Sequence, residues 1–250
     1  MSTVSQFFYS THAKVFNSVS SAIKANDISL ASRILSVKKA KLETEFESMF
    51  LPHKIEAAVS NLKGLGPLGS DTAVDIVRVQ IQTKHKTYDK YRQYESQITE
   101  KNASRLNTLI SSLHEQSSLR TEGIFRKSSN EGPVHSTAQQ IKNLLPKSLS
   151  EAENKNIQHQ ISICKGGVTP NLNGLPSPLK NVIDLCKAVV KESEYNKMGA
   201  NNLSRVIAPH FAIHSEDMAE ALENNNIAIE FIGKCITGQG KTAGNNTNLL

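Results

Sequence analysis

The first 50 residues contain neither proline nor glycine, the two residues that most strongly oppose a helix. The first proline is Pro52 and the first glycine is Gly64. Apolar residues recur in this stretch every three or four positions, as on one face of a helix. They are Val15, Val19, Ala22, Ile23, Leu30, Ile34, Leu35, Val37 and Leu42. No segment alternates apolar and polar residues for long enough to indicate a strand, so we predict an all-α protein.

Turn-forming residues place the breaks between these helices. Asn26-Asp27 predicts a break and a cap between two helices. The segment 62–69 holds three glycines and a proline and predicts a loop. Ser70-Asp71 then predicts the cap of a long helical segment that reaches Leu113, either continuous or broken near Lys101-Asn102.

The second half has shorter helical segments and more prolines and glycines. Amphipathic spacing predicts a helix over 179–190 and another that starts at Ala200 and is stopped by Pro209. A last helix is predicted over 216–236. We therefore expect a helical region over 1–100, a helical domain over 101–237 and a flexible polar tail over 238–250.

Composition excludes several classes of protein. The chain has 29 basic and 23 acidic residues and a net charge of +6, without the basic stripe and interleaved aromatics that favour nucleic-acid binding. Neither a long apolar run nor a secretory signal is present, so we expect a cytoplasmic protein. The nearby lysines Lys38, Lys39 and Lys41 favour a solvated helix face, with contact to lipid headgroups as a weaker alternative.

Cysteine and histidine spacing indicates no metal site. Cys164, Cys186 and Cys235 are scattered and form no C-x-x-C pair, so we expect three reduced thiols rather than a zinc site or a disulfide framework. His210 and His214 are four residues apart, but Pro209 opposes the regular helix that would place them as joint ligands.

One segment suggests a catalytic residue. It reads Leu119-Arg-Thr-Glu-Gly-Ile-Phe-Arg-Lys-Ser128. We expect Ile124 and Phe125 to lie in the core, so that Arg126 projects from a fixed loop. A guanidinium held in this way suits the stabilisation of a phosphoryl-transfer transition state. The alternative is that Arg126 forms a local salt bridge, as most surface arginines do.

This segment resembles the arginine-finger loop of Rho GTPase-activating domains, which reads E-G-I-F-R-x-S. The segment from Asn196 to Pro209 (N-K-M-G-A-N-N-L-S-R-V-I-A-P) resembles that family's N-K-M-x-x-x-N-L-a-x-V-f-a-P, and Leu175-Pro-Ser-Pro-Leu179 is similar to its L-P-x-P-L. The resemblance covers roughly residues 103–236.

The resemblance implies a role for particular residues. Arg126 would be the catalytic arginine, inserted into the nucleotide site of a Rho-family small GTPase of the Rac, Cdc42 or Rho type. The partner would carry GTP and Mg²⁺, so this chain would need no cofactor and no metal of its own. Contacts with the partner would come from Glu122, Lys127, Lys165, Asn196, Lys197, Asn202 and His210.

The sequence also departs from the family pattern. The family has K-x-x-L-R-E before L-P-x-P-L, where this chain has Thr169 and Asn173 in place of the lysine and arginine. Lys165 could substitute only if the loop is rearranged. Alternatively, Leu175-Pro176 matches a later L-P that opens the next helix, and the K-x-x-L-R-E element is absent. His210 stands where the family usually has asparagine, and the domain is shortened.

Two functions are consistent with these observations. The first is a GTPase-activating protein that stimulates hydrolysis by supplying Arg126 in trans, without being an enzyme on its own. The second is a RhoGAP-like module of low activity that binds a small GTPase as an adaptor or sequesters it.

Overall fold

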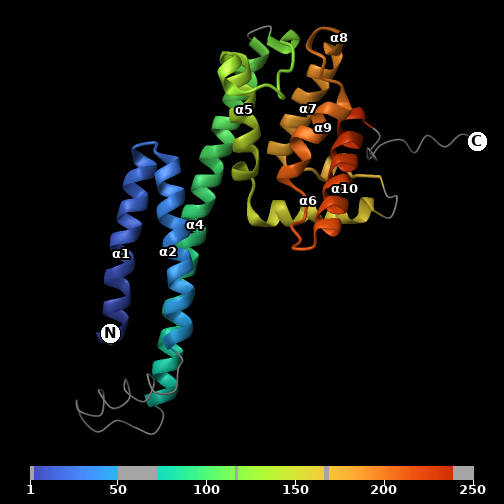
Figure 1. Ribbon diagram of the computed structural model, residues 1–250. Helices are drawn as coiled ribbons and strands as arrows, with labels where there is room; N and C mark the ends of the chain where they lie inside the picture. The colour runs from blue at the N-terminus through green and yellow to red at the C-terminus, as the bar shows by residue number, and fades with distance from the viewer. Residues whose placement is uncertain (1–2, 50–71, 116–117, 166–168, 239–250) are drawn as a thin grey trace, which may run out of the picture. The chain divides into compact units, whose positions relative to one another are not determined.

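The computed structural model describes residues 3–49, 72–115, 118–165 and 169–238 of the 250-residue chain (Figure 1). Across these ranges the chain forms helices joined by turns and loops, and they contain no strand. The predicted all-α class is therefore confirmed. The chain divides into two compact units, Met1–Ile98 and Thr99–Leu250, close to the predicted boundary after residue 100.

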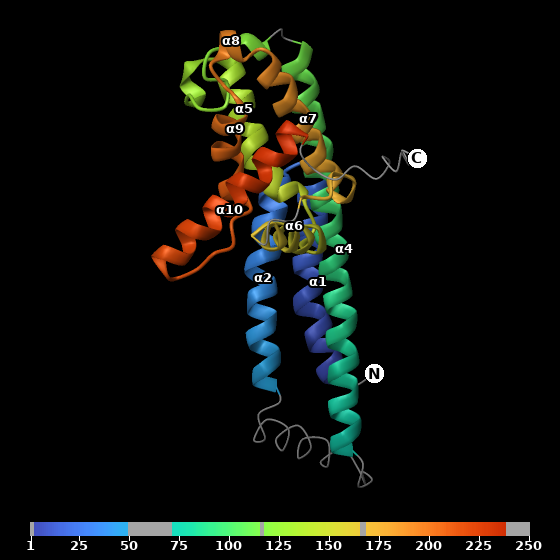
Figure 2. The same ribbon diagram turned by 90° about the vertical axis from the view of Figure 1, so that its right-hand side faces the viewer.

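Unit 1 contains α1 (Thr3–Lys24), α2 (Ile28–Met49) and the first part of α4 (Thr72–Glu115). The three helices lie side by side (Figures 1 and 2). Aromatic rings pack between them: the ring centroid of Phe16 lies 5.1 Å from that of Tyr91 and 5.7 Å from that of Tyr94. The buried core is completed by Val15, Val19, Ala22, Ala31, Leu35 and Ile98.

The turn between α1 and α2 is the predicted one. Asn26 adopts the left-handed conformation (φ 58°), which asparagine tolerates better than most residues. The Asp27 carboxylate accepts a hydrogen bond from the Leu30 amide at 3.0 Å and so caps α2. The predicted loop over 62–69, the cap at Ser70-Asp71 and the tail beyond Gly238 lie outside the described residues.

Helix α4 continues without a break through Lys101-Asn102, so the continuous alternative is correct. The side chain of Asn102 is buried, and its Nδ2 donates to the carbonyl of Lys147 at 3.0 Å. The amide therefore has a partner elsewhere in unit 2 and does not compete with the helix backbone for hydrogen bonds.

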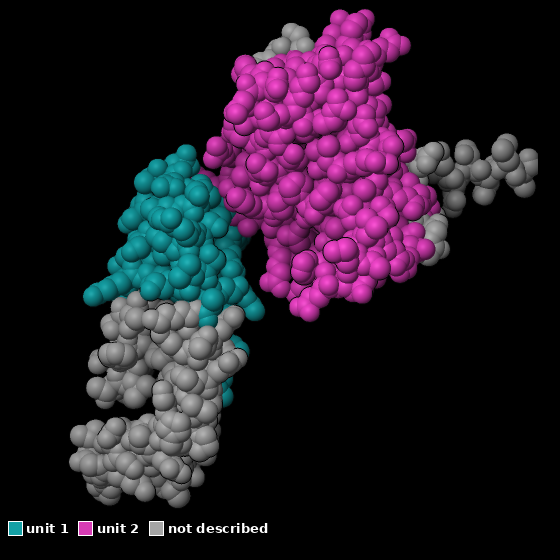
Figure 3. Space-filling view, viewed as in Figure 1, with its two compact units in different colours: residues 1–98 teal, residues 99–250 magenta. Residues whose placement is uncertain are grey.

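Unit 2, magenta in Figure 3, packs short helices around one core. After α4 come η1 (Ser118–Arg120), η2 (Ser129–Glu131), α5 (Pro133–Leu144), η3 (Leu145–Ser148), α6 (Glu151–Cys164), η4 (Leu172–Gly174), α7 (Ser177–Lys191), α8 (Ser193–Asn196), α9 (Ala200–Ile207), η5 (Ala208–His210) and α10 (Met218–Thr237). The helices predicted over 179–190, from 200 to the stop at Pro209, and over 216–236 are confirmed as α7, α9 and α10, with end shifts of one or two residues.

The three cysteines are free and buried in the core of unit 2. Burial raises the pKa of the Cys186 and Cys235 thiols to about 12. Across the described parts of the chain, none of the helices has both the length and the apolar character needed to cross a bilayer.

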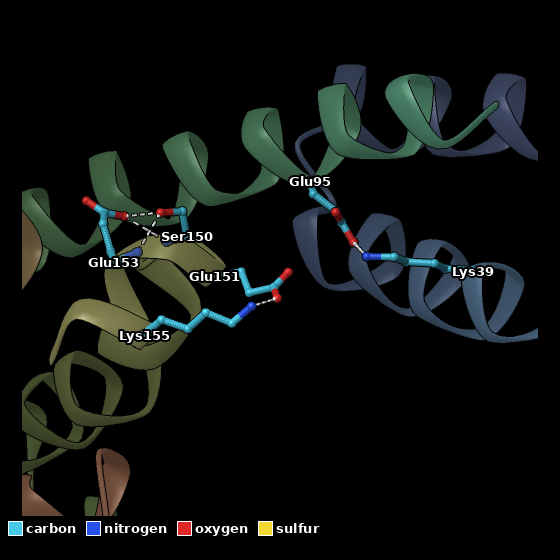
Figure 4. Close-up of polar contacts among 6 residues, drawn as sticks. All are labelled: Lys39, Glu95, Ser150, Glu151, Glu153 and Lys155. Carbon is cyan, nitrogen blue, oxygen red and sulfur yellow. Dashed lines mark hydrogen bonds and ion pairs between the residues drawn. The ribbon is translucent and has the colours of Figure 1, made fainter. Parts of the chain in front are cut away.

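Helix α6 starts with a capping box (Figure 4). The Ser150 hydroxyl accepts from the Glu153 amide at 3.3 Å, and the Glu153 carboxylate accepts from the Ser150 amide at 2.7 Å. The same helix carries an exposed ion pair of 2.6 Å between Glu151 and Lys155. The cap satisfies two backbone donors that would otherwise lack a partner, whereas the exposed pair is screened by water.

We predict that Ser150→Ala lowers the free energy of unfolding by about 1 kcal/mol, because it removes the N-cap acceptor. Lys155→Ala, one turn away, should change it by less than about 0.5 kcal/mol. Urea denaturation followed by circular dichroism measures both. Equal effects of the two substitutions would contradict the capping interpretation.

Candidate functional site

The segment from Ser118 to Ser128 forms a tight loop between α4 and α5. Gly123 adopts φ +69°, a conformation that residues with a side chain rarely take. A Cβ at this position would also lie 2.9 Å from Cγ of Lys127. The Gly123 carbonyl accepts hydrogen bonds from the amides of Arg126 (2.8 Å) and Lys127 (2.9 Å), which closes the turn. The sequence Glu-Gly-Ile-Phe-Arg thus requires glycine at its second position.

Two buried residues set the position of the turn. Ile124 and Phe125 are both fully buried and belong to the core of unit 2, as predicted, whereas the next residue, Arg126, is exposed. The backbone therefore passes from the core to the surface within one residue. Large apolar side chains in a packed core allow little displacement, so the starting point of the Arg126 side chain is well defined.

Asn196 of α8 attaches the loop to the rest of the unit. Its Nδ2 donates to the carbonyls of Leu119 (2.6 Å) and Val189 (2.8 Å), and its Oδ1 accepts from the Met198 amide (2.7 Å). The backbone carbonyl of Asn196 accepts from the Gly123 amide at 2.7 Å. These four hydrogen bonds join the loop, the end of α7 and the start of the N-K-M segment.

The sequence-based role of Asn196 needs correction. We expected its side chain to contact a partner, but it is fully buried and its amide is used within the chain. A buried side chain cannot reach a molecule docked on the surface while the loop has this conformation. Asn196 is a positioning residue for the loop.

Two further positioning residues come from α5, and sequence analysis missed both. Nε2 of His135 lies 3.1 Å from the Glu122 carbonyl, and Nε2 of Gln139 donates to the carbonyls of Phe125 (3.3 Å) and Lys127 (2.9 Å). His135 and Gln139 are four residues apart and so share one face of α5. The available signal was that His135 precedes Ala138 by three residues, which places a polar side chain on a buried face of α5.

The Arg126 guanidinium has no hydrogen bond and no ion pair with any residue that the structure describes. Two carboxylates of these segments contact other cations: Glu122 lies 3.7 Å from Lys127, and Glu192 lies 2.7 Å from Nε of Arg120. The alternative of a local salt bridge at Arg126 is therefore absent from this conformation. The arginine is exposed, and its charge is available to a ligand.

Lys197 and Asn202 lie close to the loop along the chain from Asn196. Lys197 adopts the left-handed conformation (φ 59°) at the end of α8, and its Nζ donates to the Glu194 carbonyl. Nδ2 of Asn202 donates to the Lys197 carbonyl at 3.1 Å. Both side chains are exposed, so they are accessible to a partner.

His210 is half-buried and lies near Lys142 of α5. Burial lowers the pKa of His210, and the positive charge of Lys142 lowers it further. Burial also lowers the pKa of Lys142. His210 is therefore neutral at pH 7, with one ring nitrogen as donor and the other as acceptor.

Lys165 is not brought to the loop. It caps the C-terminus of α6, and its Nζ forms an ion pair of 2.8 Å with Glu223 of α10, which raises the pKa of Lys165. Helix α6 lies at the opposite end of unit 2 from α8 and the C-terminal end of α4, between which the loop runs (Figures 1 and 2). The described segment that follows, with Thr169 and the exposed Asn173, contributes no cation either.

Among the described residues, no three His, Cys, Asp or Glu side chains lie close enough to hold a metal ion. In comparisons with known proteins, the chain matches no family model and no curated protein sequence. The resemblance to Rho GTPase-activating domains therefore depends on the three sequence motifs.

We predict that Asn196→Ala lowers the free energy of unfolding by about 2–4 kcal/mol. It leaves the Leu119 carbonyl and the Met198 amide without their partner in a buried environment. Asn202→Ala is the matched control, because its exposed amide makes one bond to a backbone carbonyl, and it should cost less than about 1 kcal/mol. Urea denaturation gives both values, and equal costs would show that Asn196 does not hold the loop.

Proposed function

We propose that this chain activates GTP hydrolysis by a Rho-family small GTPase and supplies Arg126 in trans. The observation that carries the proposal is the state of Arg126. It is exposed and has no partner among the described residues, on a loop held by the buried Ile124 and Phe125 and by the buried Asn196. The motif that contains it resembles an arginine-finger loop.

Arginine suits this reaction for physical reasons. Negative charge spreads over the transferring phosphoryl group in the transition state, and a planar guanidinium with several N–H donors can bind two of its oxygens. A fixed loop avoids the cost of ordering the backbone that carries the arginine during the reaction. Arginine fingers accelerate hydrolysis by about 10³–10⁵-fold, which corresponds to about 4–7 kcal/mol of activation free energy.

The partner would supply the nucleotide, the Mg²⁺ ion and the glutamine that orients the attacking water. This chain would supply a docking surface around Arg126 that includes Glu122, Lys127, Lys197 and Asn202. His210 would contact the partner through a neutral imidazole, which offers one donor and one acceptor as an asparagine side chain does.

A second candidate is a binding module that docks on the GTPase and stimulates hydrolysis weakly. The position of Lys165 favours it, because this lysine caps α6 and is paired with Glu223. Helix α6 lies at the opposite end of unit 2 from α8 (Figures 1 and 2). Thr169 and Asn173 supply no positive charge. The second cation of the family pattern is thus missing beside Arg126, and we propose an activation weaker than that of a domain that retains it.

We predict that Arg126→Ala abolishes stimulation of GTP hydrolysis while partner affinity falls only modestly, because the guanidinium interacts more strongly with the transition state than with the ground state. Single-turnover hydrolysis by Rac-, Cdc42- and Rho-type proteins measures the effect. Arg105→Ala, at another exposed arginine of unit 2, should retain the parent rate. If Arg126→Ala stimulates as well as the parent, the assignment of Arg126 is wrong.

A second experiment separates the activator from the binding module. Aluminium fluoride with GDP mimics the planar phosphoryl group of the transition state, so a catalytic arginine strengthens binding only in its presence. We predict a markedly tighter complex with GDP–aluminium fluoride than with GDP, and loss of most of that difference in Arg126→Ala. Isothermal titration calorimetry gives both affinities. If aluminium fluoride adds no affinity for any Rho-family partner, the binding module replaces the activator.

A further inference from the structure

Arg120 and Tyr195 form a stacked pair at the surface beside the loop. The Arg120 guanidinium carbon lies 4.5 Å from the centroid of the Tyr195 ring. Its Nε donates to the Glu192 carboxylate at 2.7 Å, which holds the guanidinium from a second side. The Arg120 side chain is 62% exposed, and Tyr195 is 55% exposed.

The pair has the features of a binding contact that is ordered before binding. Tyrosine and arginine are enriched among the interface residues that contribute most to affinity. The ring and the carboxylate already restrict the Arg120 side chain, so a partner would lose little free energy in ordering it. With Nε donating to Glu192, the terminal amino groups of the guanidinium remain to donate to a second carboxylate.

The hydrogen bonds of Asn196 place this pair relative to the Arg126 loop. Arg120 follows Leu119, whose carbonyl accepts from the Asn196 side chain, and Tyr195 directly precedes Asn196. The Gly123 amide donates to the Asn196 carbonyl, so the turn that carries Arg126 is attached at the same residue. A protein that receives Arg126 in its active site would therefore lie close to Arg120 and Tyr195.

Charge at this surface favours an acidic contact. The segments 120–127 and 191–197 carry five basic residues, Arg120, Arg126, Lys127, Lys191 and Lys197, against three acidic ones, Glu122, Glu192 and Glu194. Glu122 and Glu192 already contact Lys127 and Arg120, so positive charge is in excess. Oppositely charged surfaces increase the rate of association and orient the partner.

We propose that Arg120 and Tyr195 form a second contact for the same GTPase, which binds an exposed Asp or Glu side chain of that partner against the guanidinium and packs its neighbours on the ring. This inference depends on the proposed function. The contact lies outside the nucleotide site, so it sets affinity equally in the ground state and in the transition state and leaves the rate at saturation unchanged.

The experiment measures single-turnover GTP hydrolysis as the concentration of the full chain is varied, with the Rac-, Cdc42- or Rho-type protein that the parent stimulates most. Arg120→Ala and Tyr195→Ala should each raise the half-saturating concentration at least about fivefold, with a maximal rate within about twofold of the parent. Tyr195→Phe is the matched control, because it keeps the ring and should keep the parent value. Thermal unfolding verifies that these exposed substitutions leave the fold intact.

Other outcomes are equally informative. Unchanged half-saturation in both alanine variants overturns this inference and leaves the proposed function in place. A fall in maximal rate at unchanged half-saturation also overturns it, because the pair would then only support the shape of the loop.

If the parent stimulates no GTPase, the activator proposal fails. Calorimetry with the GTP-loaded partners then tests the contact at Arg120 and Tyr195. Weaker binding by both alanine variants supports the contact, whereas equal binding by parent and variants, or no binding by the parent, overturns it.

Discussion

The side-chain amide of Asn196 is the interaction on which the candidate site depends. It donates to carbonyls on two separate segments and accepts from a third, and its own carbonyl receives the Gly123 amide. A buried amide with all these partners is stable, and one that lost them would carry the full cost of desolvation. The hydrogen bonds from Asn196 of α8 therefore determine the shape of the loop that carries Arg126.

The remaining contacts distinguish residues that hold the loop in place from residues whose side chains are free to bind a partner. His135 and Gln139 bond to loop carbonyls, while Glu192 orders Arg120. Arg126 has no such partner among the described residues, whereas Glu122 and Glu192 contact Lys127 and Arg120. This distribution supports the proposal of a surface that binds an anionic ligand. Arg120 and Arg126 lie on one short segment, and Tyr195 directly precedes Asn196, which is bonded to that segment.

Sequence analysis predicted the parts of this arrangement that depend on local patterns. Helical periodicity gave α7, α9 and α10, and the succession of apolar and charged residues placed Phe125 inside and Arg126 outside. It failed where a polar side chain bonds to backbone far away in the chain. Asn102, Asn196 and Gln139 all do this, and no spacing rule indicates which distant carbonyl will be the acceptor. Lys165 shows the same difficulty. Its place in the sequence shortly before L-P-x-P-L did not predict that it pairs with Glu223 of α10.

The bond between Asn196 and Leu119 joins residues 77 positions apart. During synthesis the ribosome completes the loop sequence well before it adds Asn196, so the loop cannot take its final shape until α7 and α8 have emerged and folded against it. Closing so long a segment costs entropy before any contact repays it. The loop is thus completed only after α7 and α8 have been synthesised. A nascent chain that ends before Asn196 carries the Arg126 segment without the hydrogen bonds that fix its shape.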